Sequence, residues 1–255
     1  MNAAQLTRTV VEKYSQPEEL EAWSRIVSEG LSAHEQAYVN RHFRPGQRLL
    51  DIGCGGGRES IALSQKGFNV VGVDLVACLV AAARQNAEDI GAGIPFAVMN
   101  AASLGFSAEA FDGVLMLSQI LALIPLRSNR MLALAEVHRV LKPGGRLVLT
   151  SHSRNSHWKY RMYFAVMDNL RRLGRSLGAT TLESGDRFAS KVGPASSAGR
   201  HYLHMYSLEE MVKDLGDSGF RVVECNSRKE MEEKRIDERN RENDYYIIYA
   251  AEKIS

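Results

Sequence analysis

Between residues 48 and 151, short apolar runs alternate with longer amphipathic segments. The short runs predict β-strands, and the segments between them have the apolar spacing of helices. Strands that alternate with helices at this spacing indicate right-handed βαβ units in a parallel sheet. The predicted strands are 48–52, 68–74, 94–99, 111–117 and 145–151, and the main predicted helices between them are 58–66, 77–90 and 128–141.

The two ends of the chain extend this pattern. Residues 3–43 have helical spacing, and a helix is also predicted over 207–219. Ser207 and Glu210 at its start have the signature of a capping box. The charged run near the C-terminus is expected to be a solvated helix or loop rather than a binding arm. Two closing strands are predicted at 220–225 and 244–253.

An aromatic and basic segment interrupts the alternation after the fifth predicted strand. We interpret this segment as an insertion that caps the carboxyl edge of the sheet. The expected fold is a doubly wound α/β fold with a mostly parallel, seven-stranded, Rossmann-like sheet. The predicted divisions are an N-terminal helical segment over 1–44, an α/β core over 45–151, the cap insertion over 152–206, and a C-terminal helix with closing strands over 207–255.

Composition narrows the classes of protein that this chain can be. A formal net charge of +2 over 255 residues does not require a nucleic acid or an anionic membrane as partner. The three cysteines form no C-x-x-C pair, so we expect neither a disulfide framework nor a zinc site. Since there is no apolar signal segment and no long apolar stretch, we expect a cytoplasmic protein without a membrane partner.

A glycine-rich loop over residues 49–60 is the most informative motif. An apolar strand leads directly into it, and a helix follows. Gly53, Gly55 and Gly57 leave no Cβ between the backbone and a ligand. Asp51 precedes them, and the third glycine of the dinucleotide motif G-x-G-x-x-G is replaced by arginine. An acid here repels a pyrophosphate and attracts an amino group, so the loop favours a cationic or zwitterionic nucleoside.

A second acid sharpens this interpretation. Asp74 ends the next predicted strand, and a carboxylate at that position can accept hydrogen bonds from both ribose hydroxyls of an adenosine. The alternative is that Asp74 only caps the following helix.

Four motifs in order now resemble a known family. The segments DIGCGGG, VVGVD, FDGVLML and LKPGGRLVLT are similar to successive motifs of the class I S-adenosylmethionine-dependent methyltransferases. The resemblance covers roughly residues 45–151 and, more loosely, the strands at 220–253. As a set in this order the motifs are specific, although each alone is not. Pro143-Gly144-Gly145 in the last motif is expected to turn a helix into a strand.

The resemblance implies a role for each matching position. The glycine loop would line the methionine and ribose portions of S-adenosylmethionine, Asp51 would reach the amino group directly or through water, and Asp74 would hold the ribose. Asn100 stands where the family usually has an acid that meets the adenine amino group, and it can accept through its side-chain oxygen. The predicted cofactor-binding residues are Tyr14, Arg25, Asp51, Gly53, Cys54, Gly55, Asp74, Leu75, Asn100, Ala101 and Ser118.

Helices before the first strand often close over the cofactor in relatives, which implies a lid over 1–44. Tyr14, Trp23 and Arg25 are candidates there, since a guanidinium can pair with the methionine carboxylate. Arg58 could serve the same carboxylate. The alternative is that Trp23 belongs to a helix-pair core and that Arg25 lies on the surface.

Methyl transfer requires a base only when the acceptor carries a proton to lose. Histidine is the natural candidate because it titrates near neutral pH. For each histidine a packing or surface role remains the alternative, and no metal is expected. The candidate catalytic residues, all in or beside the cap, are His152, His157, His201 and His204.

Three functions remain open after the motifs are assigned. The first is methylation of a small molecule at oxygen, nitrogen or carbon. The second is methylation of RNA, such as tRNA, docked on the basic cap, although the [N/D/S]PP[Y/F] motif of base-amino methyltransferases is absent after the fourth strand. The third is a binding module without catalysis. We favour the first, with a small-molecule acceptor as partner and nucleic acid as the alternative.

Overall fold

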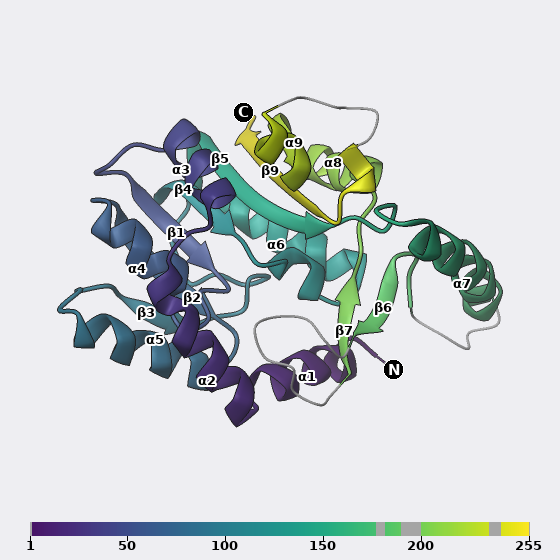
Figure 1. Cartoon of the computed structure of the whole chain (residues 1–255), viewed down its shortest axis with the longest axis horizontal. Coiled ribbons are helices and arrows are strands. Elements are labelled where there is room, and N and C mark those ends of the chain that lie inside the picture. The colour runs from purple at the N-terminus through teal and green to yellow at the C-terminus, as the bar shows by residue number, and fades with distance from the viewer. Residues whose placement is uncertain (1, 177–181, 190–199, 235–240, 255) are drawn as a thin grey trace.

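The computed structural model describes residues 2–176, 182–189, 200–234 and 241–254, and within them a seven-stranded sheet forms the centre of the molecule (Figure 1). Its strand order is β3-β2-β1-β4-β5-β9-β8. The strands of this sheet are β1 (Arg48–Ile52), β2 (Asn69–Asp74), β3 (Phe96–Val98), β4 (Phe111–Met116), β5 (Leu141–His152), β8 (Phe220–Ser227) and β9 (Tyr246–Lys253).

Helices connect the strands and also precede them. Before β1 come α1 (Ala3–Tyr14), α2 (Pro17–Arg25), the short 3₁₀ helix η1 (Ile26–Glu29) and α3 (Ala33–His42). Within and after the core the helices are α4 (Arg58–Gln65), α5 (Ala77–Asp89), η2 (Ile120–Leu123), α6 (Arg127–Val140), α7 (Trp158–Ser176), α8 (Leu208–Asp217), α9 (Arg228–Glu233) and η3 (Arg241–Asn243).

The order of the strands determines where a ligand-binding crevice lies in this sheet. β1 to β5 pair with one another in parallel, whereas β9 runs antiparallel to both β5 and β8. The chain builds β1, β2 and β3 outward in one direction and then returns to place β4 on the other side of β1. Such a reversal opens a crevice at the carboxyl ends of the two central strands. The predicted doubly wound sheet is therefore confirmed.

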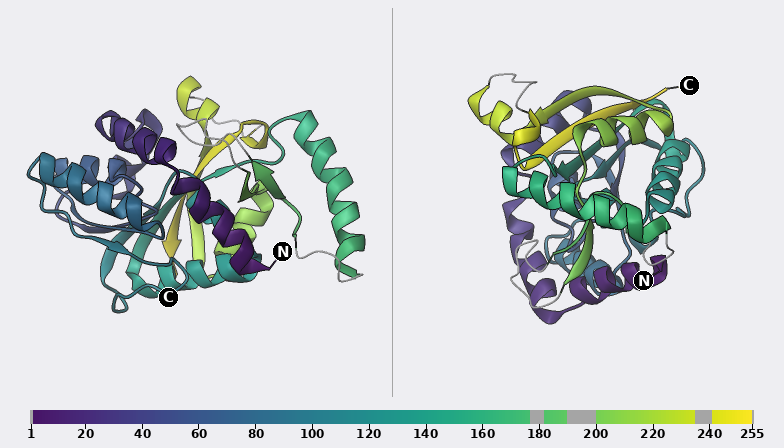
Figure 2. Two further views of the ribbon diagram at one scale, coloured as in Figure 1. Left: turned by 90° about the horizontal axis from the view of Figure 1, so that it is seen from below. Right: turned by 90° about the vertical axis from the view of Figure 1, so that its right-hand side faces the viewer.

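Successive side chains of a strand point to opposite faces of the sheet, so the apolar strands form two apolar layers, one on each face. On β1, Leu49 packs in a cluster with side chains of α3 and α4, whereas Leu50 belongs to the cluster that includes α6 and α8. Two further views show helices on both sides of the twisted sheet (Figure 2). Burial on both faces explains why these strands read as nearly continuous apolar runs.

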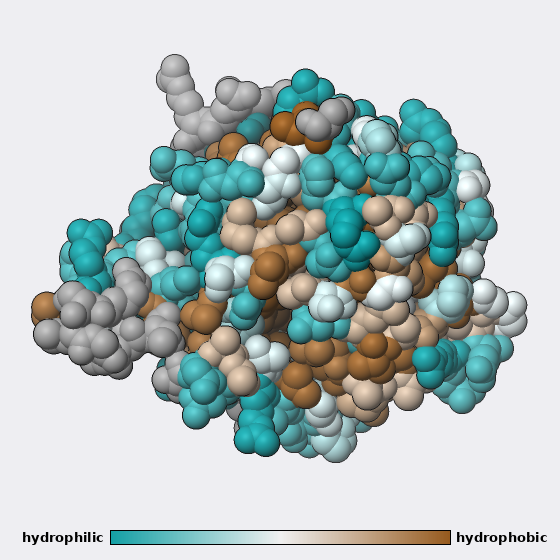
Figure 3. Space-filling model, turned by 180° about the vertical axis from the view of Figure 1, so that it is seen from behind, coloured by the Kyte–Doolittle hydropathy of each residue, from teal (hydrophilic) through white to brown (hydrophobic). Residues whose placement is uncertain are grey.

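The predicted cap contains a long helix and a small second sheet. β6 (Asp186–Ala189) and β7 (His201–His204) pair antiparallel, and α7 precedes them. α1 lies along β7, where Thr9 Oγ1 accepts a hydrogen bond from the Tyr202 N–H at 3.1 Å. The first helix and the insertion, far apart in sequence, therefore meet. Seen from behind, apolar surface gathers in the middle and lower part of the molecule (Figure 3).

Two local expectations need correction. The Ser207 hydroxyl does accept the Glu210 N–H at 3.1 Å, but the Glu210 carboxylate turns to His204 and Arg154 instead of completing a capping box. Pro143-Gly144-Gly145 does not form the helix-to-strand turn, because β5 already begins at Leu141. These residues form an irregularity in β5, where the pairing with β4 shifts register.

Close packing at Gly113 on β4 gives a test of this core. A Cβ there would lie 2.2 Å from Phe43 Cε1 and 2.8 Å from Leu49 Cδ2. We expect Gly113→Ala to lower the free energy of unfolding by about 1–3 kcal/mol through overpacking, measured by urea denaturation. Gly93→Ala is the control, since nothing lies within 4 Å of its Cβ position. Equal stability of the two variants would contradict this packing.

Candidate functional site

A cavity of about 220 Å³ opens at the carboxyl ends of β1, β2 and β4, where the strand order places the crevice. The glycine loop after β1 forms one wall, the ends of β2 and β3 a second, and the segment after β4 a third. α1 and α2 close the fourth side. Apolar side chains dominate the lining, and a few charged groups interrupt it, as is typical of a small-molecule site.

Asp74 fastens the glycine loop to the neighbouring strand. Its Oδ2 accepts the Gly55 N–H at 3.0 Å, and its Oδ1 accepts the Val76 N–H at 2.8 Å. Burial is the main cause that raises its pKa, and these backbone hydrogen bonds oppose the rise. The side chain does serve the start of α5, as in the alternative interpretation, but it also lines the cavity, where each oxygen keeps a lone pair.

Backbone conformation brings the loop close to its ligand. Gly53 has φ +78°, and a Cβ there would meet the Ile120 side chain at 2.2 Å, so only glycine fits beneath this wall. Ser118 and Gln119, directly after β4, have φ +53° and +70°, a region that residues with a Cβ rarely adopt. Such strain is common where the backbone is held for function.

Arg58 and Glu59 form the charged end of the cavity. The Arg58 guanidinium donates to both Glu35 carboxylate oxygens at 3.0 and 3.1 Å and also bonds Glu59. Ser118 Oγ lies 3.3 Å from Glu59 and 3.4 Å from Arg58. Arg58 also donates to the Gly30 carbonyl at 2.7 Å, so it links the N-terminal helices to the glycine loop.

Asp51 lies behind this wall, at the end of β1, and is 1% exposed. The Ser60 hydroxyl donates to its Oδ2 at 2.6 Å. Burial raises the pKa of Asp51 to about 8, helped by the charge of Glu59. Glu59 is also buried and Asp74 is partly buried, so in the described part of the chain these acids outnumber the one cation, Arg58, that lines the cavity. The geometry therefore favours a ligand that carries positive charge.

Comparison with known proteins agrees with this geometry. A family model described as a methyltransferase domain matches residues 50–149. A ubiquinone biosynthesis O-methyltransferase of Pseudomonas aeruginosa is 32% identical over 110 residues, 43% of this chain and 46% of the relative. A solved S-adenosylmethionine-dependent methyltransferase from Methanosarcina mazei superposes with a TM-score of 0.68 at 26% identity, over 88% of this chain and 99% of that one.

The methyltransferase domain over residues 50–149 is that of a class I S-adenosylmethionine-dependent methyltransferase. The aligned segment spans less than half the length of the ubiquinone-biosynthesis relatives. The structure of a [4+2]-cyclase has the same fold, with a TM-score of 0.66 at 20% identity over 97% of each chain. S-adenosylmethionine is the cofactor of the family, and the resemblance predicted from the four motifs is confirmed.

The structure brings most of the predicted cofactor-binding residues of this methyltransferase together. Their individual roles stay predictions. Asn100 Oδ1 accepts the Ala102 N–H at 2.9 Å, so its side-chain oxygen is already partly used in a turn. Asp51 lies behind the wall and not in it. The predicted residues that line the cavity are Tyr14, Gly53, Cys54, Gly55, Asp74, Leu75, Asn100, Ala101 and Ser118.

Arg25, like Asp51, is a predicted residue that is not among the residues lining the cavity. Its side chain is exposed at the end of α2, whereas Trp23 lines the cavity. Two residues along a helix point about 200° apart, so both side chains cannot face the same wall. Arg58 lines the cavity instead, although its guanidinium is engaged with two carboxylates.

None of the four candidate histidines is among the lining residues of this cavity. His152 stacks on Tyr245 with ring centroids 3.8 Å apart, and burial lowers its pKa to about 3. His157 is exposed beside Trp158. His201 is buried edge-on to Tyr14, and burial lowers its pKa to about 4. A role as general base stays a prediction that these positions do not favour.

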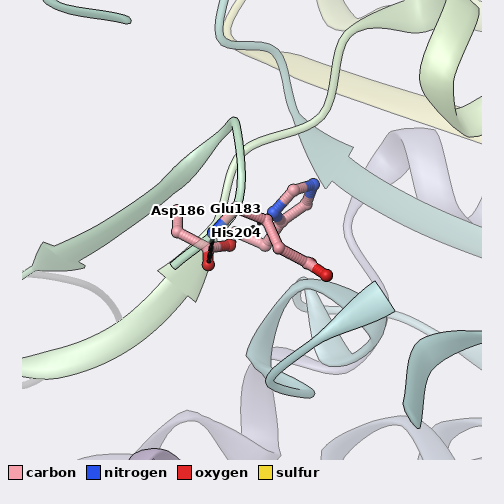
Figure 4. A group of neighbouring side chains, drawn as sticks. All are labelled: Glu183, Asp186 and His204. Carbon is pink, nitrogen blue, oxygen red and sulfur yellow. Dashed lines mark hydrogen bonds and ion pairs between the residues drawn. The ribbon is translucent and has the colours of Figure 1, made fainter. Parts of the chain in front are cut away.

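His204 belongs to a buried charged cluster with Glu183 and Asp186, whose ligand-type atoms lie within 4.8 Å of one another (Figure 4). Protein groups already bind these side chains. Asp186 lies 2.7 Å from His204 Nδ1, and the Arg130 guanidinium donates to Glu183 at 3.0 Å. The Tyr202 hydroxyl donates to Asp186 at 2.6 Å. The cluster fastens β6 and β7 to α6, and the absence of a metal stays a prediction.

The sequence analysis did not predict that Glu59 and most of the α1 residues concerned line the cavity. Thr7, Val10, Val11 and Tyr14 all line the cavity. Their spacing places them on one face of α1, so the signal was present as a helical stripe. Glu59 gave no such signal, because an acid in the first turn of a helix is commonly a favourable partner for the helix dipole.

The raised pKa of Asp51 predicts proton release on cofactor binding. The free protein holds this carboxyl mostly protonated below about pH 8, and the ammonium group of S-adenosylhomocysteine nearby would lower its pKa. Affinity should therefore rise as pH increases toward 8. Calorimetry at pH 7, run in buffers of different ionisation enthalpy, should show a proton released from the parent.

Two variants test whether Asp51 is the source of the released proton. Asp51→Asn should abolish the release, whereas Asp112→Asn, at the opposite end of β4 and outside the cavity lining, should retain it. Equal proton release from the parent and Asp51→Asn would show that Asp51 does not sense the ligand.

Proposed function

We propose that this protein transfers the methyl group of S-adenosylmethionine to a small-molecule acceptor. The observation that carries the proposal is the excess of acid at a nucleoside-sized, glycine-walled cavity: among the described residues, Glu59 and Asp74 line it with one cation, Arg58, and the buried Asp51 lies behind its wall. The bound cofactor supplies a methyl group already activated by its positive sulfonium. A cationic ligand of this kind offsets the unbalanced acids, whereas a dinucleotide pyrophosphate would add to them.

The residues fit this cofactor part by part. Asp74 would accept the ribose hydroxyls through the lone pairs left by Gly55 and Val76. Asp51 and Glu59 would stabilise the ammonium group from behind and beside the glycine loop. The turn at Asn100 and Ala101 and the side chain of Leu75 would hold the adenine.

Positioning and exclusion of water would supply much of the rate, because the sulfonium needs no further activation. α1 and α2 already close one side of the cavity through Tyr14 and Trp23. Leu123, Ile124 and Pro125 give an apolar wall after β4, which suits an uncharged organic acceptor better than a phosphate. The name of the Pseudomonas relative, an O-methyltransferase of ubiquinone biosynthesis, supports an acceptor of this class.

The alternative of RNA methylation requires exposed cations on the cap, and α7 does expose some basic residues. Several of its arginines are used inside the protein. Arg154 pairs with Glu210 at 3.1 Å, and Arg171 is 5% exposed and pairs with Asp168 at 3.6 Å. These contacts weaken the case for RNA as the methyl acceptor, but they do not identify a particular small-molecule acceptor. The match to the methyltransferase family disfavours the alternative of a non-catalytic module.

Labelled methyl groups distinguish these functions. With methyl-tritiated S-adenosylmethionine, we expect label in organic-extractable phenolic acceptors and none in acid-precipitable bulk tRNA. S-adenosylhomocysteine should bind with a dissociation constant on the order of micromolar, and NADH should not compete. Label in tRNA alone would overturn the proposed acceptor class, and tight NADH binding without a response to S-adenosylhomocysteine would overturn the cofactor.

Replacing Asp74 tests the ribose contact. Asp74→Ala removes two hydrogen bonds to a charged acceptor, each worth roughly 1.5–3 kcal/mol, so affinity for S-adenosylhomocysteine should fall at least about tenfold. Asp74→Asn keeps one acceptor oxygen and should lose less. Because Asp74 also holds Gly55, thermal melting must show that the variants fold. Asp89→Ala, on the outer end of α5, is the matched control, and unchanged affinity of Asp74→Ala would reduce Asp74 to a helix cap.

A further inference from the structure

One helix of this protein presents its apolar face to solvent. On α7 the apolar residues 158, 162, 166, 170 and 173 recur every three or four positions and therefore share one face. A surface helix normally turns such a face toward the core. Here their exposed fractions are 54% for Trp158, 61% for Met162, 58% for Val166, 58% for Leu170 and 60% for Leu173.

The opposite face of α7 fixes the helix in this orientation. Phe164 is 3% exposed and belongs to the main apolar core. Arg171 is 5% exposed, and its guanidinium donates to the Glu183 carbonyl at 3.3 Å. With its inner face packed, α7 cannot rotate to bury the outer stripe. The stripe is about 22 Å long at a rise of 1.5 Å per residue.

Exposed cations lie beside the stripe, although Arg161 also donates to the Asn155 carbonyl at 3.2 Å and to Asn243 Oδ1 at 3.0 Å, and the Lys159 ammonium lies 5.8 Å from the centre of the Trp158 ring. Lys159, Arg161 and Arg172 are exposed on α7. The acid of this helix, Asp168, pairs with Arg171 and accepts the Ser184 hydroxyl on the inner side. In the described part of the chain the three exposed cations have no carboxylate partner. The outer surface of α7 is therefore apolar along its centre and positive at its edge.

We propose that α7 docks this protein on an anionic phospholipid bilayer, with the helix lying in the plane of the interface. A helix of this composition, with Trp158 and Tyr163 at its apolar side and cations at the edge, has the features of interfacial helices. The cations would contact lipid phosphates while the apolar stripe enters the headgroup boundary.

The shape of the molecule selects a bilayer over other occupants. α7 lies along the outermost side of the protein and crosses the face turned to the viewer in the right panel of Figure 2. A flat surface can therefore reach the helix along its length. A second copy of the chain would bring two sets of cations together, which like charges oppose. In the described residues no helix is long and apolar enough to cross a membrane, and a peripheral contact needs none.

This contact would revise the expectation that no membrane partner exists. That expectation came from the net charge of the whole chain and from the lack of a long apolar stretch, and neither quantity reports on one face of one helix. Docking is independent of methyl transfer, so its failure would leave the proposed function intact.

Vesicle flotation of the full chain tests the proposal. The parent should float with phosphatidylcholine vesicles that contain phosphatidylglycerol and remain behind with phosphatidylcholine alone. Val166→Asp with Leu170→Asp should lower binding at least about tenfold. Arg161→Gln with Arg172→Gln should lower binding at least about fivefold, and high salt should weaken the parent in the same way.

Matched variants keep the result interpretable. Ile90 and Leu132 are 51% and 54% exposed outside α7, so Ile90→Asp with Leu132→Asp makes the same chemical change elsewhere and should not alter flotation. Circular dichroism must show that each variant folds. A parent that does not float would overturn the proposal. So would a Val166→Asp, Leu170→Asp protein that floats as the parent does, or a parent dimer that this double variant turns into a monomer without any vesicle binding.

Discussion

The carboxylate of Asp74 holds together the parts on which the site depends. It ends β2, yet its two oxygens accept backbone N–H groups from the glycine loop after β1 and from the start of α5. Three segments that the sheet brings to one edge are thereby fixed relative to one another. Because loss of water disfavours its charged form and raises its pKa, this carboxylate depends on compensation by donors from protein or ligand.

A second charged group extends this arrangement to the N-terminal helices. Arg58 leaves the glycine loop and reaches the Gly30 carbonyl and Glu35, so helices before β1 are joined to the cavity through one side chain. Glu59 remains beside the cavity, and burial is the main cause that raises its pKa. The acids that Arg58 does not balance are the basis of our proposal that this cavity takes a cationic nucleoside. The same physical property connects the family membership to the chemistry that we propose.

The sequence predicted the central sheet well because the central parallel strands β1 and β4 are buried on both faces and leave strong apolar runs. β1 lies where the pattern predicts it, and Gly53 has the positive φ that its place after the strand indicates. The side-chain network of the cap could not be predicted in the same way. Arg130 is 1% exposed and contacts Glu183 and Tyr202, which lie far along the chain, so no local spacing reveals the contacts.

The same limit explains the histidines and the outer face of α7. His204 was a candidate base by residue type, whereas its acid partner Asp186 lies on the other strand of the small sheet, and no local spacing reveals that contact. An apolar stripe on a helix predicts a buried face, and only the structure shows that the stripe of α7 lies outside. Local patterns therefore fix elements and loops, while the partners of charged groups and the direction of a helix face depend on tertiary packing.

The central claim is that Asp74 and the glycine loop hold the nucleoside of S-adenosylmethionine at the carboxyl ends of β1 and β2. A crystal structure of the protein with S-adenosylhomocysteine tests it most directly. The account predicts both ribose hydroxyls within hydrogen-bond distance of the Asp74 carboxylate, and the ammonium group of the ligand on the side of Asp51 and Glu59. A ligand bound elsewhere, or a ribose that does not contact Asp74, would contradict it.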